Sequence, residues 1–283
     1  MTYYGFILRF LAIPIFILVV ITYYDWRKGN KIPDRLSYWP AWAAILLHVV
    51  IALFYTTIWD NYLVATRVWW YDPDLVTGIT LGWVPIEEYT FFIVQPILAG
   101  LWLFFLARRL RPVASPGPLL TWLRWISTSL LAILWLASVI ALVAGWGEAT
   151  YMALELGWAL PPIGLQLLFG ADILWRYRRL VTLIVVSLTL YLSAADTVAI
   201  NLGTWTINPE KSFDLLLGGI LPIEEFLFFL LTNTLITFGI TLVISEESHG
   251  RFELLRRHGL KGAFVDPVAL VTSESEAEPA PEH

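Results

Sequence analysis

Long apolar runs separated by short polar stretches recur along the chain. A helix needs about 20 apolar residues to cross a hydrocarbon layer of about 30 Å, and seven runs reach that length. We therefore predict an all-α integral membrane protein with seven transmembrane helices. The predicted spans are Tyr4–Tyr24, Trp39–Trp59, Leu81–Leu106, Leu120–Gly145, Ala149–Gly170, Leu180–Asn201 and Leu215–Ile244.

The composition agrees with a membrane protein. Only 14% of the residues are charged and 58% are hydrophobic, whereas a soluble domain carries about 25% charge. There is no cysteine, which excludes disulfides, thiolate metal sites and a cysteine nucleophile. The first apolar run lacks a small-residue cleavage site, so we expect it to remain in the protein.

The positive charges predict the orientation. With seven spans, every lysine and arginine except Arg9, Arg67 and Lys211 falls on one side. The positive-inside rule makes that side cytoplasmic, so we expect a multi-pass protein of the cell membrane with its N-terminus outside. Asp25 and Asp172 lie beside arginines at cytoplasmic helix ends, and we interpret them as ion-paired anchors.

A motif occurs twice in the chain. Residues 82–92 and 219–229 both read Gly-x-x-Pro-Ile-Glu-Glu-aromatic-x-Phe-Phe. Upstream matches extend the similarity and pair Pro14, Asp25, Asp60, Trp69 and Pro73 with Pro161, Asp172, Asp196, Trp205 and Pro209.

This duplication predicts a 3+1+3 arrangement of helices. The units are a three-helix repeat (1–110), a linker with the fourth helix (111–147), a second three-helix repeat (148–245) and a cytoplasmic tail (246–283). The extra crossing makes the repeats parallel, related by an axis along the membrane normal. The tail is rich in Ser, Glu, Pro and Ala from Thr272 onward, and we expect that part to be disordered.

Each motif carries two glutamates at the start of its last helix. Carboxylates inside a membrane cost about 2.5–3.5 kcal/mol each on insertion scales, so four at matched positions suggest acid–base catalysis. Neighbouring helical residues diverge by about 100°, and we predict that Glu88 and Glu225 face the interior rather than Glu87 and Glu224. The alternative is a normal helix start, because proline and acidic residues favour the first turn.

Other residues are weaker candidates. Asp60 and Asp196 either extend the acid cluster or pair with Arg67, Arg9 or Lys211. The aromatic residues either line an apolar tunnel and stabilise a cation, or belong to the core and the interfacial belt. These aromatic candidates are Trp69, Phe91, Phe92, Trp205, Phe228 and Phe229.

Several signatures are absent from the sequence. No Gly-x-Gly-x-x-Gly follows a strand and no His-Glu-x-x-His occurs, so we expect neither a nucleotide cofactor nor a metal. All four lysines lie outside the predicted helix cores, which excludes a retinal Schiff base. We expect no cofactor and no nucleic-acid partner.

The doubled motif and the 3+1+3 layout resemble the lycopene cyclase domain of the heterodimer type. The resemblance covers residues 1–245 and is to the fused two-repeat form of archaea, some bacteria and fungi, without the fungal phytoene synthase. The halves differ after the motif, where Gln95–Pro96 stands in one and Thr232–Asn233 in the other.

The resemblance implies a lycopene beta-cyclase, an isomerase that closes ionone rings by redox-neutral acid–base chemistry and yields gamma- and beta-carotene. It implies catalytic roles for the four glutamates. The expected partners are a lipid-soluble carotenoid substrate, membrane lipid and other carotenoid-pathway enzymes. Alternatives are a cyclase for C50 carotenoids or for one end only, a 3+1+3 transporter of small solutes, and a structural subunit of a pigment-synthesising complex.

Overall fold

The computed structural model describes residues 1–110 and 120–258. Within these ranges, seven helical segments are long and apolar enough to cross a membrane, which confirms the predicted number. The first combines α1 (Tyr3–Ile7), a π-helical turn (Leu8–Ala12) and α2 (Ile13–Arg27). The others contain α3 (Ala41–Ala65), α4 (Ile86–Ala107), α5 (Trp122–Val143), α6 (Thr150–Arg176), α7 (Arg178–Asn201) and α8 (Ile223–Ile244).

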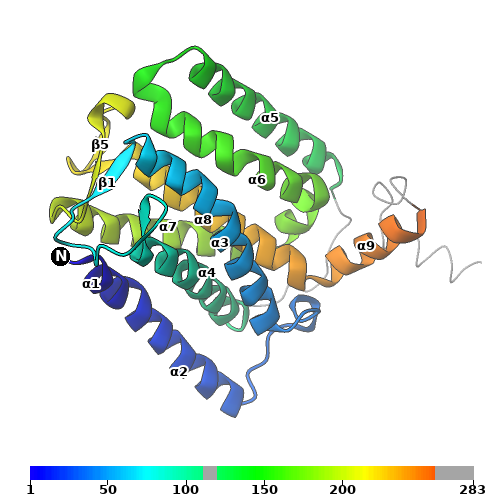
Figure 1. Cartoon of the computed structure of the whole chain (residues 1–283). Coiled ribbons are helices and arrows are strands. Elements are labelled where there is room, and N and C mark those ends of the chain that lie inside the picture. Colours follow the sequence, from blue (N-terminus) through cyan, green and yellow to red (C-terminus); the bar gives the residue numbers. More distant parts are fainter. Residues whose placement is uncertain (111–119, 259–283) are drawn as a thin grey trace, which may run out of the picture.

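A further helix, α9 (Glu246–His258), follows α8. It occupies the first part of the predicted tail, and the segment predicted to be disordered from Thr272 lies outside the described residues. Figure 1 shows α9 at the end of the molecule opposite to the N-terminus.

The predicted starts of the third and seventh spans, at Leu81 and Leu215, are wrong. Short antiparallel hairpins precede both helices: β2 (Thr80–Leu81) pairs with β3 (Val84–Pro85), and β5 (Leu216–Leu217) pairs with β6 (Leu221–Pro222). Apart from Thr80, the strand residues of the hairpins are apolar, so the sequence pattern does not separate them from the helices. Gly82 and Gly219 turn the chain with φ of +69° and +75°, a conformation that glycine adopts readily. Each helix then begins directly after the proline of its motif.

A two-stranded sheet joins distant parts of the chain. β1 (Trp69–Tyr71) pairs antiparallel with β4 (Trp205–Ile207), and Trp70 lies opposite Thr206. Both strands follow the end of a membrane-spanning helix. Figure 1 places the labelled strands near the N-terminus, at one end of the helices. This end carries the candidate site.

Helices α4 and α8, which begin with the two motifs, pack against each other at the centre. α3 and α7 both contact this pair, α2 packs on α4, and α6 packs on α8. α5 packs along α6 at the periphery (Figure 1). The two motif helices therefore have neighbours from both halves of the chain.

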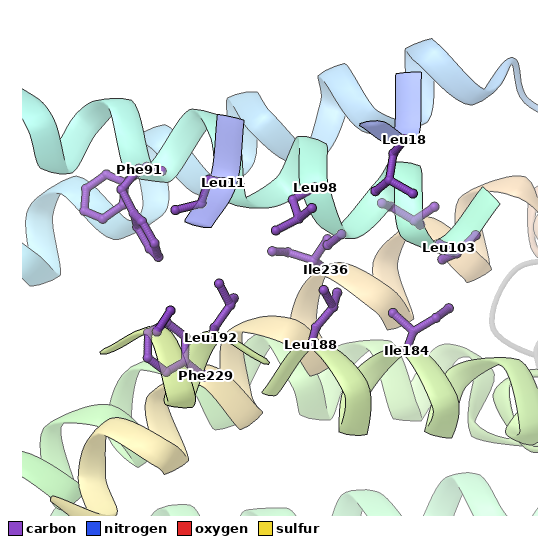
Figure 2. Packing of buried hydrophobic residues seen from close by; sticks show 14 of the residues in the cluster. Leu11, Leu18, Phe91, Leu98, Leu103, Ile184, Leu188, Leu192, Phe229 and Ile236 are labelled. Carbon is purple, nitrogen blue, oxygen red and sulfur yellow. The ribbon is translucent and has the colours of Figure 1, made fainter. Parts of the chain in front are cut away.

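The space between α2, α4, α7 and α8 is filled by apolar side chains. Figure 2 shows leucines, isoleucines and phenylalanines from these helices and the π-helical turn facing one another. Leu11, Leu103 and Ile184 are fully buried there. Because lipid is as apolar as these side chains, close packing rather than exclusion from water holds such helices together.

A polar link crosses the α4–α8 contact. Gln95 Nε2 donates to Thr232 Oγ1 at 3.1 Å and to Asn233 Oδ1 at 3.4 Å. Asn233 Nδ2 in turn donates to Thr189 Oγ1 of α7 at 3.4 Å. The position at which the two halves differ in sequence thus becomes a hydrogen-bonded connection between them.

Two buried aspartates form ion pairs near the ends of their helices. Asp25 binds Arg108 at 3.0 Å and Arg109 at 2.9 Å. Asp172 of α6 binds Arg251 of α9 at 2.6 Å, and both side chains are almost completely buried. The interpretation of Asp25 and Asp172 as ion-paired anchors is confirmed.

Candidate active site

Glu88 and Glu225 face one small cavity. The cavity has a volume of about 50 Å³ and lies where α1, α4, α6, α7 and α8 meet the β1–β4 sheet. Besides the two glutamates, its lining consists of Asp196, Ile207, three tyrosines and six other aromatic residues. Two carboxyl groups that lie far apart in the sequence therefore share an enclosure that is mostly aromatic.

The other two motif glutamates point elsewhere. Glu87 Oε1 accepts a hydrogen bond from the Thr77 backbone N–H at 2.6 Å, and Glu224 Oε1 accepts one from the Phe213 N–H at 2.8 Å. Neither residue lines the cavity. Helix geometry predicts this division, because neighbouring side chains diverge by about 100°. Glu87 and Glu224 hold the loops that lead into the two hairpins.

Tyrosine hydroxyls hold the two cavity-facing glutamates. Glu88 Oε2 accepts hydrogen bonds from Tyr3 and from Tyr71, the latter at 3.0 Å. Tyr151 donates to Glu225 Oε1 at 2.7 Å. Burial, together with the nearby Asp60 and Glu88 carboxyl groups, raises the pKa of Tyr71 well above its usual value, so this phenol keeps its proton and remains a donor.

Asp196 belongs to the same cluster. Its Oδ1 accepts a hydrogen bond from Trp205 Nε1 at 2.9 Å, and its carboxyl group interacts directly with that of Glu225. Asp60 is 1% exposed and lies near Glu88 outside the cavity lining. Neither Asp60 oxygen has a hydrogen-bond partner in the described part of the chain.

The alternative pairing of these aspartates with cations is wrong. Arg9 donates to the Gly5 carbonyl at 3.0 Å, and Lys211 donates to the Thr66 carbonyl. Across residues 1–110 and 120–258, neither Asp60 nor Asp196 forms a salt bridge. Both aspartates instead extend the acid cluster.

Five of the six aromatic candidates line the cavity. They are Trp69, Phe91, Trp205, Phe228 and Phe229. Phe92 lies on a second cavity instead. Trp69 meets Tyr151 edge to face at 5.2 Å, and Phe91 meets Phe229 in the same way at 6.5 Å. The acids therefore face mainly aromatic side chains.

Sequence reasoning missed Tyr3 and Tyr151. The repeat register gave no signal, because the pairing of Pro14 with Pro161 places Tyr3 opposite Thr150 rather than Tyr151. In addition, tyrosine near the end of a membrane helix is typical of the interfacial belt. The geometry therefore adds two phenols to the acid cluster.

This arrangement can both give and take a proton. Carboxyl groups within hydrogen-bonding reach of one another and of phenols are the usual components of general acid–base catalysis. The aromatic walls limit access of water, which would otherwise compete for a reactive cation. The site suits proton-initiated chemistry on an apolar molecule.

Known proteins share much of this sequence. The protein named lycopene beta-cyclase from Halobacterium salinarum is 38% identical over 208 residues, which cover 71% of this chain and 81% of that protein. The chain belongs to the lycopene beta-cyclase family. A relative from Aspergillus oryzae, named bifunctional lycopene cyclase/phytoene synthase, is 35% identical over 234 residues, which cover 81% of this chain and 39% of the fungal protein.

Membership of the lycopene beta-cyclase family confirms the resemblance found in the doubled motif. No family model matches the chain, and no solved structure does.

Proposed function

We propose that this protein is a lycopene cyclase that closes terminal β rings, with gamma-carotene and then beta-carotene as products. One observation carries the proposal: the second glutamates of both motifs, Glu88 and Glu225, face one aromatic cavity in a chain of the lycopene beta-cyclase family. The substrate is a hydrocarbon dissolved in the bilayer.

The reaction begins and ends with a proton transfer. An acid protonates the terminal 1,2 double bond and creates a tertiary cation. The 5,6 double bond attacks this cation and closes a six-membered ring, which moves the positive charge to the ring. A base then removes a ring proton. One proton enters and one leaves, so the product is an isomer and no cofactor is consumed.

The hydrogen bonds suggest which carboxyl group has which role. Two phenols donate to Glu88, and donors of this kind stabilise a carboxylate. We assign Glu88 as the base. Glu225 lies against Asp196, and a proton shared by this pair removes the repulsion between two anions. We assign Glu225, supported by Asp196, as the acid.

The aromatic walls stabilise the intermediate cation. Cations are attracted to the faces of aromatic rings by about 0.5–2 kcal/mol. Phe91, Phe229, Trp69 and Trp205 line the cavity beside the carboxyl groups. They also exclude water, so the cation is attacked by the internal double bond.

The membrane arrangement follows from the charge pattern and the duplicated elements. We assign the three-helix units as parallel repeats, supported by the hairpins before α4 and α8 and by the matched motifs. The arginine-rich side is cytoplasmic, so the N-terminus lies outside the cell membrane. Other carotenoid enzymes are the expected partners, because a fungal relative is named for a cyclase and a synthase together.

Expression in cells that accumulate red lycopene tests the function. The expected result is conversion to yellow or orange cyclic carotenoids, identified by chromatography against standards. A double variant, Glu88→Gln with Glu225→Gln, is the control and should leave the lycopene unchanged. If the unmodified protein reaches the membrane and lycopene persists, the proposed activity is wrong.

A further inference from the structure

A second cavity lies deeper among the helices. It has a volume of about 160 Å³ and is lined by side chains from α3, α4, α6 and α8. On α8 the lining runs from Phe228 past Thr232 to Ile236, and on α3 it runs from Thr56 past Ala52 to His48. Each stretch covers nine residues, and its eight steps of 1.5 Å make about 12 Å of helix. The cavity is therefore elongated along the helices.

This cavity continues from the acid cavity. Phe228 lines both of them. Its ring is stacked on Trp59 with centroids 6.0 Å apart and meets Phe229 edge to face at 5.3 Å. Phe228 is thus the shared wall, one helical turn below Glu225.

The two cavities differ in volume, and the difference limits what each can hold. An apolar cavity of about 150 Å³ is what a benzene-sized molecule occupies. A ring-forming end group carries methyl groups and is larger than benzene, so neither the acid cavity, at about 50 Å³, nor the second cavity, at about 160 Å³, holds it alone. Because Phe228 lines both spaces, a rotation of its side chain would join them.

The lining of the second cavity suits a hydrocarbon. Its polar side chains are largely engaged with backbone carbonyls: Tyr55 donates at 2.8 Å, Thr232 at 2.9 Å and His48 at 2.8 Å. Gln166 Oε1 and Trp158 Nε1, which lack partners within the described ranges, are covered by protein atoms and contribute almost no surface. An unfunctionalised chain loses no hydrogen bond on entering.

The second cavity lies on the α3–α6 side of the central helix pair. On the other side, between α2, α4, α7 and α8, the apolar side chains in Figure 2 fill the interior. The cavity borders the seam between α3 and α6, where Ile51 is half-exposed on the outer surface of the helices. A polyene can reach the acids from this seam.

We infer that the second cavity binds the linear polyene chain of the substrate, with Phe228 as the movable partition between the chain and the acids. The inference rests on the proposed cyclase function and adds a binding site to it. A single chain site means that the two ends of one substrate molecule are cyclised in separate binding events.

Filling the cavity tests this inference. Ala52 lies on its wall, so Ala52→Trp should block the chain, and Ala52→Leu should block it partly. Ala137→Trp, on the lipid-facing side of α5, is the matched control. In lycopene-accumulating cells, Ala52→Trp should lower the cyclic product per membrane-inserted protein by about tenfold or more. The amount of cyclic product made by Ala52→Leu should lie between the amounts made by Ala52→Trp and by the control.

Binding separates this inference from the catalytic proposal. The Glu225→Gln variant in lipid nanodiscs should retain lycopene after washing, and Glu225→Gln combined with Ala52→Trp should retain far less. The chain site is overturned if these two variants retain equal amounts of lycopene, or if Ala52→Trp alone shows normal turnover. If lycopene is retained and Ala52→Trp abolishes retention, the chain site stands even where the unmodified protein makes no cyclic product. If Ala52→Trp is not inserted, Ala52→Leu decides by the same two measurements.

Discussion

The Tyr151 hydroxyl, in the first turn of α6, donates to Glu225 in the first turn of α8 across 2.7 Å. Tyr3 of α1 holds Glu88 of α4 in the same way. In each half, the first helix therefore supplies a phenol to the glutamate of the last helix, and the position of the carboxyl group depends on how these helices pack.

Tyr151→Phe should reduce cyclisation by about tenfold to a hundredfold. Glu225 becomes charged as it gives its proton to the substrate, and a hydrogen bond to a charged group is worth about 1.5–3 kcal/mol. Each 1.36 kcal/mol corresponds to a factor of about ten in rate. The measurement is kcat of the purified protein in lipid nanodiscs. Tyr191→Phe is the control, because that phenol donates to the Phe10 carbonyl on an exposed face. Unchanged turnover in Tyr151→Phe would show that the phenol does not position Glu225.

Replacing the motif glutamates singly by glutamine should divide them into two classes. Glu88→Gln and Glu225→Gln should lower turnover by about 10²–10⁴-fold, the usual contribution of a general acid or base. Glu87→Gln and Glu224→Gln should keep most of the activity, since glutamine can still accept the backbone hydrogen bonds of the loops. Product formed per enzyme in membranes is the readout. An equal loss of turnover in all four variants would contradict this division into two classes.

Asp172→Asn should destabilise the protein by about 3–5 kcal/mol, because it leaves the buried charge of Arg251 without its carboxylate. The apparent melting temperature in detergent should fall accordingly. Glu253→Gln removes the carboxylate from the exposed pair with Arg256 and should cost only about 0–1 kcal/mol. Similar melting temperatures for the two variants would mean that Asp172 is not an anchor for α9.

Gly239→Ala should also destabilise the fold. A β-carbon at Gly239 would collide with the imidazole of His48, and such overpacking costs about 1–3 kcal/mol. Gly157 is the control, because no atom outside its own helix lies within 4 Å of an added β-carbon. Gly157→Ala should be neutral or stabilising by up to about 1 kcal/mol. Combining Gly239→Ala with His48→Ala should recover part of the lost stability. If the double variant recovers none, the added β-carbon does not collide with His48.

The number of spans and the division between glutamates could be predicted from the sequence, because both follow from local geometry. Apolar runs of sufficient length identify spanning helices, and the 100° step along a helix separates Glu87 from Glu88. The hairpins before α4 and α8 were not predicted, since Leu216, Leu217 and Leu221 look like the apolar helix that follows them.

The contacts that complete the site depend on distant parts of the chain. The β1–β4 pairing joins three-residue strands, which are too short to show a periodic pattern. The placement of Tyr3 against Glu88 depends on how the first helix packs. Phe92 and Phe91 are adjacent, yet they face different cavities, and no local signal indicates which space each one lines.

Helix α5 packs on α6, and neither cavity is lined by it. The halves of the chain are instead joined by Gln95 with Thr232 and by the β1–β4 sheet. Covalent continuity between α4 and α6 is therefore not what brings Glu88 and Glu225 together. Under the parallel-repeat arrangement proposed above, the molecule therefore assembles as a complex of two pieces would, and the crossing by α5 gives the second piece the same orientation in the membrane as the first.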